Sequence, residues 1–203
     1  MPYTWRSLAE RIALEGLVSA YSLHKSMRIS TSHAQWWLSY LEDLGLTRPY
    51  VKEPKGRRRT LYGLTDLGFL MAVKQVRVRR DFANIFARFI DYQDAGADQT
   101  VRVRNRKSKQ NLFDALKSTE VAGRYRDLFF SISNALDELT DIYSIDDNTV
   151  IQLAVFLAGM KEPEKMRLFL RDVSPKVLIV QRIMEAYRQA AMNLEKIVKG
   201  EML

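Results

Sequence analysis

The feature that most constrains the fold is an amphipathic pattern that begins near Ser30 and stops at Gly45. Its apolar residues recur at spacings of four, three and three, which is typical of one face of an α-helix: Ala34, Leu38, Leu41 and Leu44. The hydroxyl oxygens of residues 30–32 suit the free N–H groups of a helix start, and Gly45 suits the left-handed residue that ends a helix. The sequence therefore predicts a helix over residues 31–44 with one buried face.

The opposite face of this predicted helix has little charge but many hydrogen-bonding groups and flat rings. Its members are Ser32, His33, Gln35, Trp36, Ser39 and Tyr40. Such side chains suit the reading of base edges, because a glutamine pairs with adenine through two hydrogen bonds in the major groove. Trp37 lies nearer the apolar face, so we expect it to be packed and Trp36 to point outward. Two interpretations of Trp36 stay open, which are contact with DNA and contact with a partner protein.

A basic hairpin is predicted directly after this helix. Two short extended runs, residues 50–52 and 57–62, flank a loop that contains Pro54 and Gly56. The tip of the hairpin carries four cations, Lys55, Arg57, Arg58 and Arg59. A basic hairpin beside a helix that reads DNA is called a wing, and we use that word for residues 53–59. Its side chains are suited to phosphate contact or to entry into the minor groove.

Residues 16–76 resemble the winged helix-turn-helix DNA-binding domain of bacterial and archaeal transcription regulators in the broad PadR, ArsR and MarR group. The resemblance rests on the run from Gly16 to Ser30, on Leu41-Glu42-Asp43-Leu44-Gly45-Leu46, and on the closing run Tyr62-Gly63-Leu64-Thr65-Asp66-Leu67-Gly68. It implies a mainly α fold with a small β-hairpin wing. In that fold a short helix capped by Ser19 and the helix over 31–44 form the helix-turn-helix. The resemblance identifies a domain type, with no DNA sequence or regulated gene attached.

The charge of the chain is concentrated in its first half. Residues 1–110 carry 20 Lys and Arg against 10 Asp and Glu, whereas residues 111–203 carry 12 against 14. A basic half joined to a near-neutral half favours a module that binds a polyanion, followed by a module with another role. The alternative is that the basic excess reflects the general composition of the source proteome, but the excess coincides with the wing and its neighbours.

Composition also excludes several classes of protein. The chain has no cysteine and two histidines, so disulfides and thiolate metal sites are excluded and no metal or cofactor is predicted. His24 and His33 each lie alone on a predicted helix face, so we expect both to be exposed polar or DNA-facing residues. We find no phosphate-binding glycine loop and no histidine and carboxylate at a useful spacing, so we do not expect an enzyme. The sequence lacks a run of about 20 apolar residues and a signal-peptide pattern, so we expect no membrane association and a cytoplasmic location.

The chain divides by pattern into three parts. Residues 1–93 form the predicted winged helix-turn-helix domain with a long exit helix, residues 94–109 a basic linker, and residues 110–203 a helical domain for dimerisation or partner binding. Within the helical domain, Asp147 or Asn148 is predicted to cap one helix, and Pro163 to lie in the first turn of the next. The final helix is predicted to start near Ser174 and to bear the most regular apolar stripe: Val180, Met184, Tyr187, Leu194 and Val198. We predict that this stripe forms a dimer, together with an apolar surface that the first domain cannot cover, at Phe82, Ile85, Phe86 and Phe89. Packing inside one helical bundle is the alternative.

Two functions follow from these patterns. The first is a sequence-specific double-stranded DNA-binding protein, expected to be a dimeric transcription regulator whose C-terminal helices fix the dimer. The second is a winged-helix adaptor in DNA replication or plasmid partition that acts through protein-protein contacts. The fold alone does not separate them, since winged helices serve both purposes. The arginines of the wing favour the first function, and an exposed Trp36 and Tyr40 favour the second.

Overall fold

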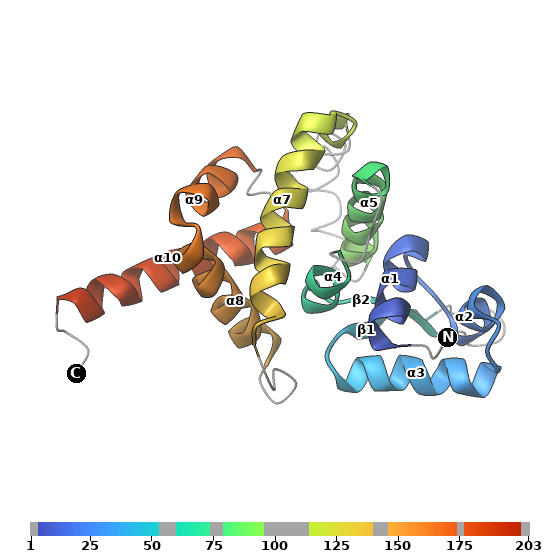
Figure 1. The fold of residues 1–203 in the computed structure, drawn as a ribbon. Coiled ribbons are helices and arrows are strands. Elements are labelled where there is room, and N and C mark those ends of the chain that lie inside the picture. The colour runs from blue at the N-terminus through green and yellow to red at the C-terminus, as the bar shows by residue number, and fades with distance from the viewer. Residues whose placement is uncertain are drawn as a thin grey trace. The chain divides into compact units, whose positions relative to one another are not determined.

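The structure is a computed structural model, and it describes residues 4–52, 60–73, 79–95, 114–139, 146–173 and 177–199 (Figure 1). The chain separates into two compact units, residues 1–118 and residues 119–203, and each is described by itself. The predicted linker, residues 94–109, lies almost entirely outside the described residues. The predicted limits of the domains stay predictions.

The chain is mainly helical with one small two-stranded antiparallel sheet, which confirms the predicted class at that level. The elements of the N-terminal unit are α1 Trp5–Glu15, α2 Ala20–Met27, α3 Thr31–Asp43, β1 Thr47–Lys52, β2 Thr60–Leu64, α4 Asp66–Val73 and α5 Arg79–Ala95. Those of the C-terminal unit are α7 Thr119–Leu136, α8 Asp147–Lys161, α9 Pro163–Asp172 and α10 Leu178–Val198. Among the described residues, no helix combines the length and the hydropathy that crossing a bilayer requires.

Side-chain caps fix the starts of the first three helices. Thr4 and Ser19 each accept a hydrogen bond from the backbone N–H three residues on, and serines at those positions, Ser7 and Ser22, return the bond. Ser30 accepts from the N–H of His33 at the start of α3. Each cap satisfies N–H groups that a helix leaves without an internal partner, so the predicted starts at residues 19 and 30 are confirmed.

The sheet is longer than predicted at its first strand. β1 begins at Thr47 and includes Pro49, and the pairing with β2 is irregular between Pro49 and Val51. A proline has no N–H to donate to the ladder, so a bulge next to it is physically expected. Val18 adds one further bridge, because its N–H and carbonyl both bond to Tyr62. A segment before α2 is thereby joined to the hairpin.

The core of the N-terminal unit lies between α1, α3, α4 and α5. Leu8 and Ile12 of α1 are fully buried, and Phe69 of α4 stacks on Phe89 of α5 with ring centroids 4.2 Å apart. We had expected the aromatic face of α5 to be left uncovered and so available to a second copy of the chain. That expectation is wrong at Phe89, because α4 of the same chain covers the ring.

The C-terminal unit is built around α8, which packs against α7, α9 and α10. The N-cap of α8 is Asp146, whereas the sequence pattern suggested Asp147 or Asn148. The Asp146 carboxylate accepts from both the N–H and the hydroxyl of Thr149, and these bonds hold the pKa of that carboxyl below its ordinary value. Pro163 occupies the first turn of α9, as predicted.

The last helix, α10, is packed along its first half. Val180 is fully buried within the C-terminal unit, and Tyr187 lies against Gly159 of α8. Beyond Ala186 the described side chains are exposed or half-buried, and Met192 is exposed. Val180 therefore packs inside one chain and does not face a second copy. The dimer itself stays a prediction.

Candidate nucleic-acid interface

Helix α3 has one buried face and one exposed face. Ala34, Leu38 and Leu41 are 0 % exposed, and burying each leucine contributes about 1.5–3 kcal/mol. The six residues predicted to form the outer face are all exposed: Ser32, His33, Gln35, Trp36, Ser39 and Tyr40. Neither lysine nor arginine occurs in α3, and no acidic side chain lies in its first turn. The exposed face is thus a continuous strip of hydroxyl, amide, imidazole and aromatic groups.

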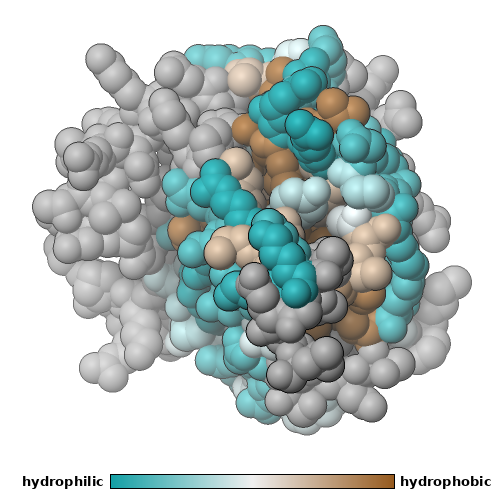
Figure 2. All heavy atoms as spheres, turned by 90° about the vertical axis from the view of Figure 1, so that its left-hand side faces the viewer, coloured by the Kyte–Doolittle hydropathy of each residue, from teal (hydrophilic) through white to brown (hydrophobic). Residues whose placement is uncertain are grey.

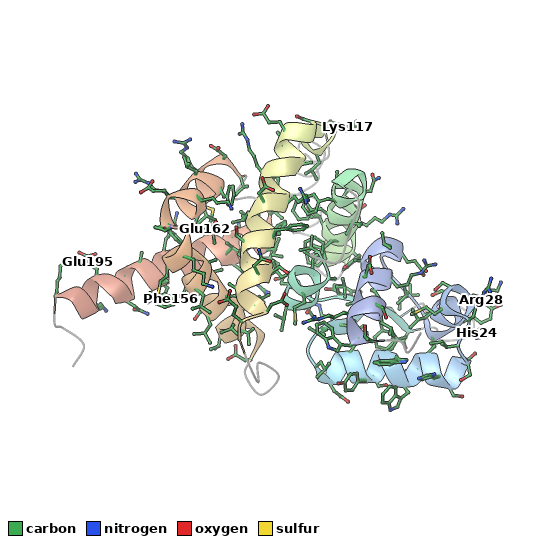
Figure 3. The ribbon with its side chains drawn as sticks, in the orientation of Figure 1. His24, Arg28, Lys117, Phe156, Glu162 and Glu195 are labelled. Carbon is green, nitrogen blue, oxygen red and sulfur yellow. The ribbon has the colours of Figure 1, made fainter. Side chains whose placement is uncertain are left out.

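The turn between α2 and α3 is held by a partly buried hydrogen bond that the sequence pattern did not indicate. Arg28 has the left-handed backbone conformation, with φ 55°, and ends α2. His24 Nδ1–H donates to the carbonyl of Ile29, one residue before the cap of α3. Figure 3 shows His24 and Arg28 together at this end of the N-terminal unit. We expected His24 to be an exposed or DNA-facing residue, but it is half-buried and orients the turn.

Four aromatic rings gather where α3 meets the start of α1. Trp36 and Tyr40 are parallel within 3°, with centroids 5.5 Å apart, and Trp37 meets both edge-on. Trp36 is 55 % exposed, whereas Trp37 is half-buried, as predicted. The guanidinium of Arg6 lies 5.1 Å from the centroid of the Trp5 ring, within the range of a cation–π contact.

These rings line an open pocket of about 530 Å³. Its lining residues are Thr4, Trp5, Arg6, Trp36, Trp37 and Tyr40, which we call the aromatic pocket. The first three come from the start of α1 and the last three from α3. The contribution of α1 could not be predicted from the sequence, because contacts between two helices leave no spacing pattern in either one.

Hydrogen bonds of Thr65, the residue after β2, fix the hairpin to the turn that follows α3. Thr65 donates its hydroxyl to the carbonyl of Gly45 at 2.6 Å, and its N–H donates to the carbonyl of Leu46 at 3.1 Å. Gly45 has φ 69°, which is the left-handed conformation predicted for it. The same threonine hydroxyl accepts from the N–H of Gly68 at the start of α4. One residue thus connects the end of α3, the end of β2 and α4.

A polar chain joins the hairpin to α5. Arg48 Nη2 donates to Gln93 Oε1 at 3.0 Å, and Gln93 Nε2 donates to the buried carboxylate of Asp66 at 3.2 Å. Beside it, Tyr50 meets the ring of Tyr92 edge-on and donates its hydroxyl to the Leu64 carbonyl. Burial raises the pKa of Tyr92 well above its ordinary value. These contacts hold the base of the hairpin against a long helix.

The remaining predicted site residues divide into two groups. The wing residues Lys55, Arg57, Arg58 and Arg59 lie outside the described residues. Of the predicted dimer stripe, Met184 and Tyr187 are half-buried, and the side chains of Leu194 and Val198 are not described. In the C-terminal unit the exposed large apolar residues include Leu153, Met160, Leu168, Leu178 and Met192. Figure 2 shows hydrophobic residues, in brown, among hydrophilic ones on the face that it presents.

The described geometry defines a mainly helical protein with an exposed polar and aromatic helix beside a small hairpin. Comparison with protein-family models, with curated proteins and with solved structures found no match. Among the described residues, no three His, Asp or Glu side chains converge in a way that could hold a metal ion.

Proposed function

We propose that this protein is a sequence-specific double-stranded DNA-binding protein of the winged helix-turn-helix type, and that it acts as a dimeric transcription regulator. The observation that carries the proposal is the outer face of α3. All six residues predicted to read DNA are exposed on one side of a helix whose other side is anchored in the core. A helix of this kind fits the major groove, where amide and hydroxyl groups distinguish the base pairs.

The elements around α3 support the same proposal. A short turn that contains the left-handed Arg28 joins α2 to α3, and a helix-turn-helix has two helices joined by such a short turn. The β1–β2 hairpin follows directly after α3. The bridge between Val18 and Tyr62 adds a third extended segment to the hairpin, an arrangement that suits a winged helix. The sequence between β1 and β2 contains the cations of the predicted wing, Lys55, Arg57, Arg58 and Arg59. In this proposal those cations supply the phosphate contacts that α3 lacks.

A dimer completes the proposal, because one winged helix buries little DNA surface. Two copies of α3 related by a two-fold axis would contact successive major-groove faces about 34–36 Å apart, so the preferred site is an inverted repeat. The C-terminal unit supplies the exposed apolar surface for pairing, including Met192 on the outer half of α10.

The second candidate is a winged-helix adaptor in DNA replication or plasmid partition that works through protein contacts. The exposed stack of Trp36 and Tyr40 favours it, because exposed tryptophan and tyrosine are enriched at the centres of protein interfaces. The absence of any cation on α3 points the same way. Salt separates the two candidates, since phosphate-mediated DNA binding weakens steeply as salt rises and an aromatic protein contact does not.

The test is selection of bound duplexes from a random pool by the full chain. We expect an inverted repeat, and we expect Gln35→Ala to relax the preference at one base pair of each half-site. The loss of discrimination should be about 1–3 kcal/mol, the usual value of a bidentate contact. Gln152→Ala is the matched control, because it makes the same change at an exposed position of α8, outside the proposed DNA-reading face. Recovery of no preferred sequence, or equal losses by Gln35→Ala on selected and random DNA, would count against base reading by α3.

A further inference from the structure

The aromatic pocket is more than a part of the exposed face of α3. It joins α3 to the start of α1 and combines four rings with one guanidinium in a volume of about 530 Å³. None of its lining residues carries a carboxylate. Thr4 and Tyr40 add hydroxyl groups at its edge. A planar, uncharged ring attached to an anionic group would match this lining.

The geometry of the rings limits how such a ligand binds. A ring placed between two others needs about 7 Å of separation, twice the contact distance of roughly 3.5 Å. Trp36 and Tyr40 are parallel but only 5.5 Å apart, so nothing inserts between them. A planar ligand must stack on their outer surface instead, with Trp37 edge-on beside it. The pair is therefore a stacking platform rather than a cage.

The openness of the pocket favours a ring that belongs to a larger molecule. Sites for free small molecules usually enclose most of the ligand surface, whereas Trp36 and Tyr40 stay well exposed here. A ring tethered to a polymer that is already bound nearby gains a high effective concentration and needs less enclosure. Because Trp36 and Tyr40 also belong to the proposed DNA-binding face, the polymer that fits is DNA.

We propose that the aromatic pocket binds one unpaired nucleobase, which stacks on Trp36 and Tyr40 while Arg6 contacts the phosphate beside it. This inference rests on the proposed function, since α3 must first hold the duplex. Stacking on an aromatic ring tolerates any base, because every base has a flat π face. The protein then prefers a duplex that carries a bulged or extruded base to a fully paired duplex of the same sequence.

Tryptophan fluorescence tests this directly, because all three tryptophans of the chain, Trp5, Trp36 and Trp37, line the pocket. The probes are a fully paired duplex and the same duplex with one extra unpaired thymine, each titrated into the full-length protein at one fixed salt concentration. We expect the bulged duplex to quench the fluorescence more strongly and to bind about tenfold more tightly, which is within the usual worth of one stacked base.

Variants distinguish stacking from a general loss of binding. Trp36→Ala should abolish the tenfold preference and Trp36→Phe should retain most of it. The preference is the ratio of the affinities for the two duplexes, so it is compared within each variant whatever the variant does to paired binding. Tyr21→Ala, which removes another exposed ring of the same unit outside the pocket, should leave the preference unchanged. Circular dichroism checks that each variant keeps the helical content of the parent.

Three results would overturn the inference. Equal affinity for the two duplexes with intact paired binding would reject the nucleobase and leave the proposed function standing. Retention of the preference by Trp36→Ala would place the unpaired base elsewhere. Absence of binding to either duplex would reject the proposed function as well, and would leave the pocket to a protein partner.

Discussion

At the scale of single residues, the orientation of α3 depends on a few side chains that lie outside both its exposed face and the aromatic pocket. His24 is the clearest case, because its Nδ1–H bond to the Ile29 carbonyl fixes the turn that precedes α3. Since the acceptor is a carbonyl, Nδ1 must carry a proton. An asparagine amide nitrogen occupies nearly the same position as Nδ1, so the role of this bond is testable.

We predict that His24→Ala lowers the free energy of unfolding by about 0.5–1.5 kcal/mol, the usual net worth of one hydrogen bond. His24→Asn should recover most of that loss because it restores the donor. Urea unfolding followed by circular dichroism measures both values, and duplex affinity should change in the same order. Equal destabilisation by the alanine and the asparagine would show that packing, and not the hydrogen bond, holds the turn.

Residue roles were predictable from the sequence where spacing encodes them. The inward and outward faces of α3 follow from the apolar period, and Ser19, Ser30 and Gly45 follow from helix-end chemistry. The role of His24 did not follow, because a bond to a backbone carbonyl depends on the conformation of the turn. The share of Trp5 and Arg6 in the aromatic pocket depends on how α1 meets α3, which no local pattern contains.

At the scale of elements, the start of α4 lies close against the backbone of Leu46, between α3 and β1. A Cβ atom on Gly68 would lie 1.9 Å from the carbonyl oxygen of Leu46, and a backbone atom cannot move aside cheaply. Gly123 in α7 is the opposite case, because a Cβ there would meet nothing within 4 Å. The two glycines form a matched pair for the same substitution.

We predict that Gly68→Ala lowers the free energy of unfolding of the N-terminal unit by about 1–3 kcal/mol, the usual cost of overpacking. Gly123→Ala should instead stabilise α7 by roughly 0.5–1 kcal/mol, because alanine loses less backbone entropy in a helix. Thermal unfolding of the two full-length variants measures the shifts. A Gly68→Ala protein as stable as the parent would contradict the close approach of α4 to Leu46.

The elements themselves were largely predictable, but some limits were not. Proline inside β1 misled the prediction of where that strand starts, since the bulge that accommodates Pro49 is a property of the pair of strands. The N-cap of α8 is Asp146, at least one residue before the predicted Asp147 or Asn148. Residue type could not choose among the three, because aspartate and asparagine are both good N-caps. The cover of Phe89 was missed, because it comes from α4 through a tertiary contact.

At the scale of the whole molecule, the proposal requires a dimer. The outer half of α10 offers Met192, exposed next to polar neighbours such as Gln189. Gln152 is exposed on a different helix, α8, so adding a charge at Met192 and at Gln152 in turn separates an interface on α10 from a general charge effect.

We predict that the full-length protein sediments as a dimer at micromolar concentration and that Met192→Glu shifts it towards monomer, because a charge would be buried at the interface. Gln152→Glu adds the same charge outside α10 and should leave the dimer intact. Analytical ultracentrifugation of the three proteins measures this. A parent protein that sediments as a monomer would rule out the dimer, and a dimeric Met192→Glu variant would move the interface away from this part of α10.

The central claim is that the chain binds duplex DNA through α3 and the wing, and the salt dependence of binding tests it most directly. Duplex affinity should be measured over a range of salt concentrations for the parent protein and for the variant Arg57→Ala, Arg58→Ala, Arg59→Ala. We predict that the logarithm of the parent's affinity falls linearly with the logarithm of salt. The triple variant should bind all sequences more weakly, and each lost phosphate contact should reduce the slope by about 0.9. Binding that ignores salt, or a triple variant that binds as the parent does at low salt, would contradict the account.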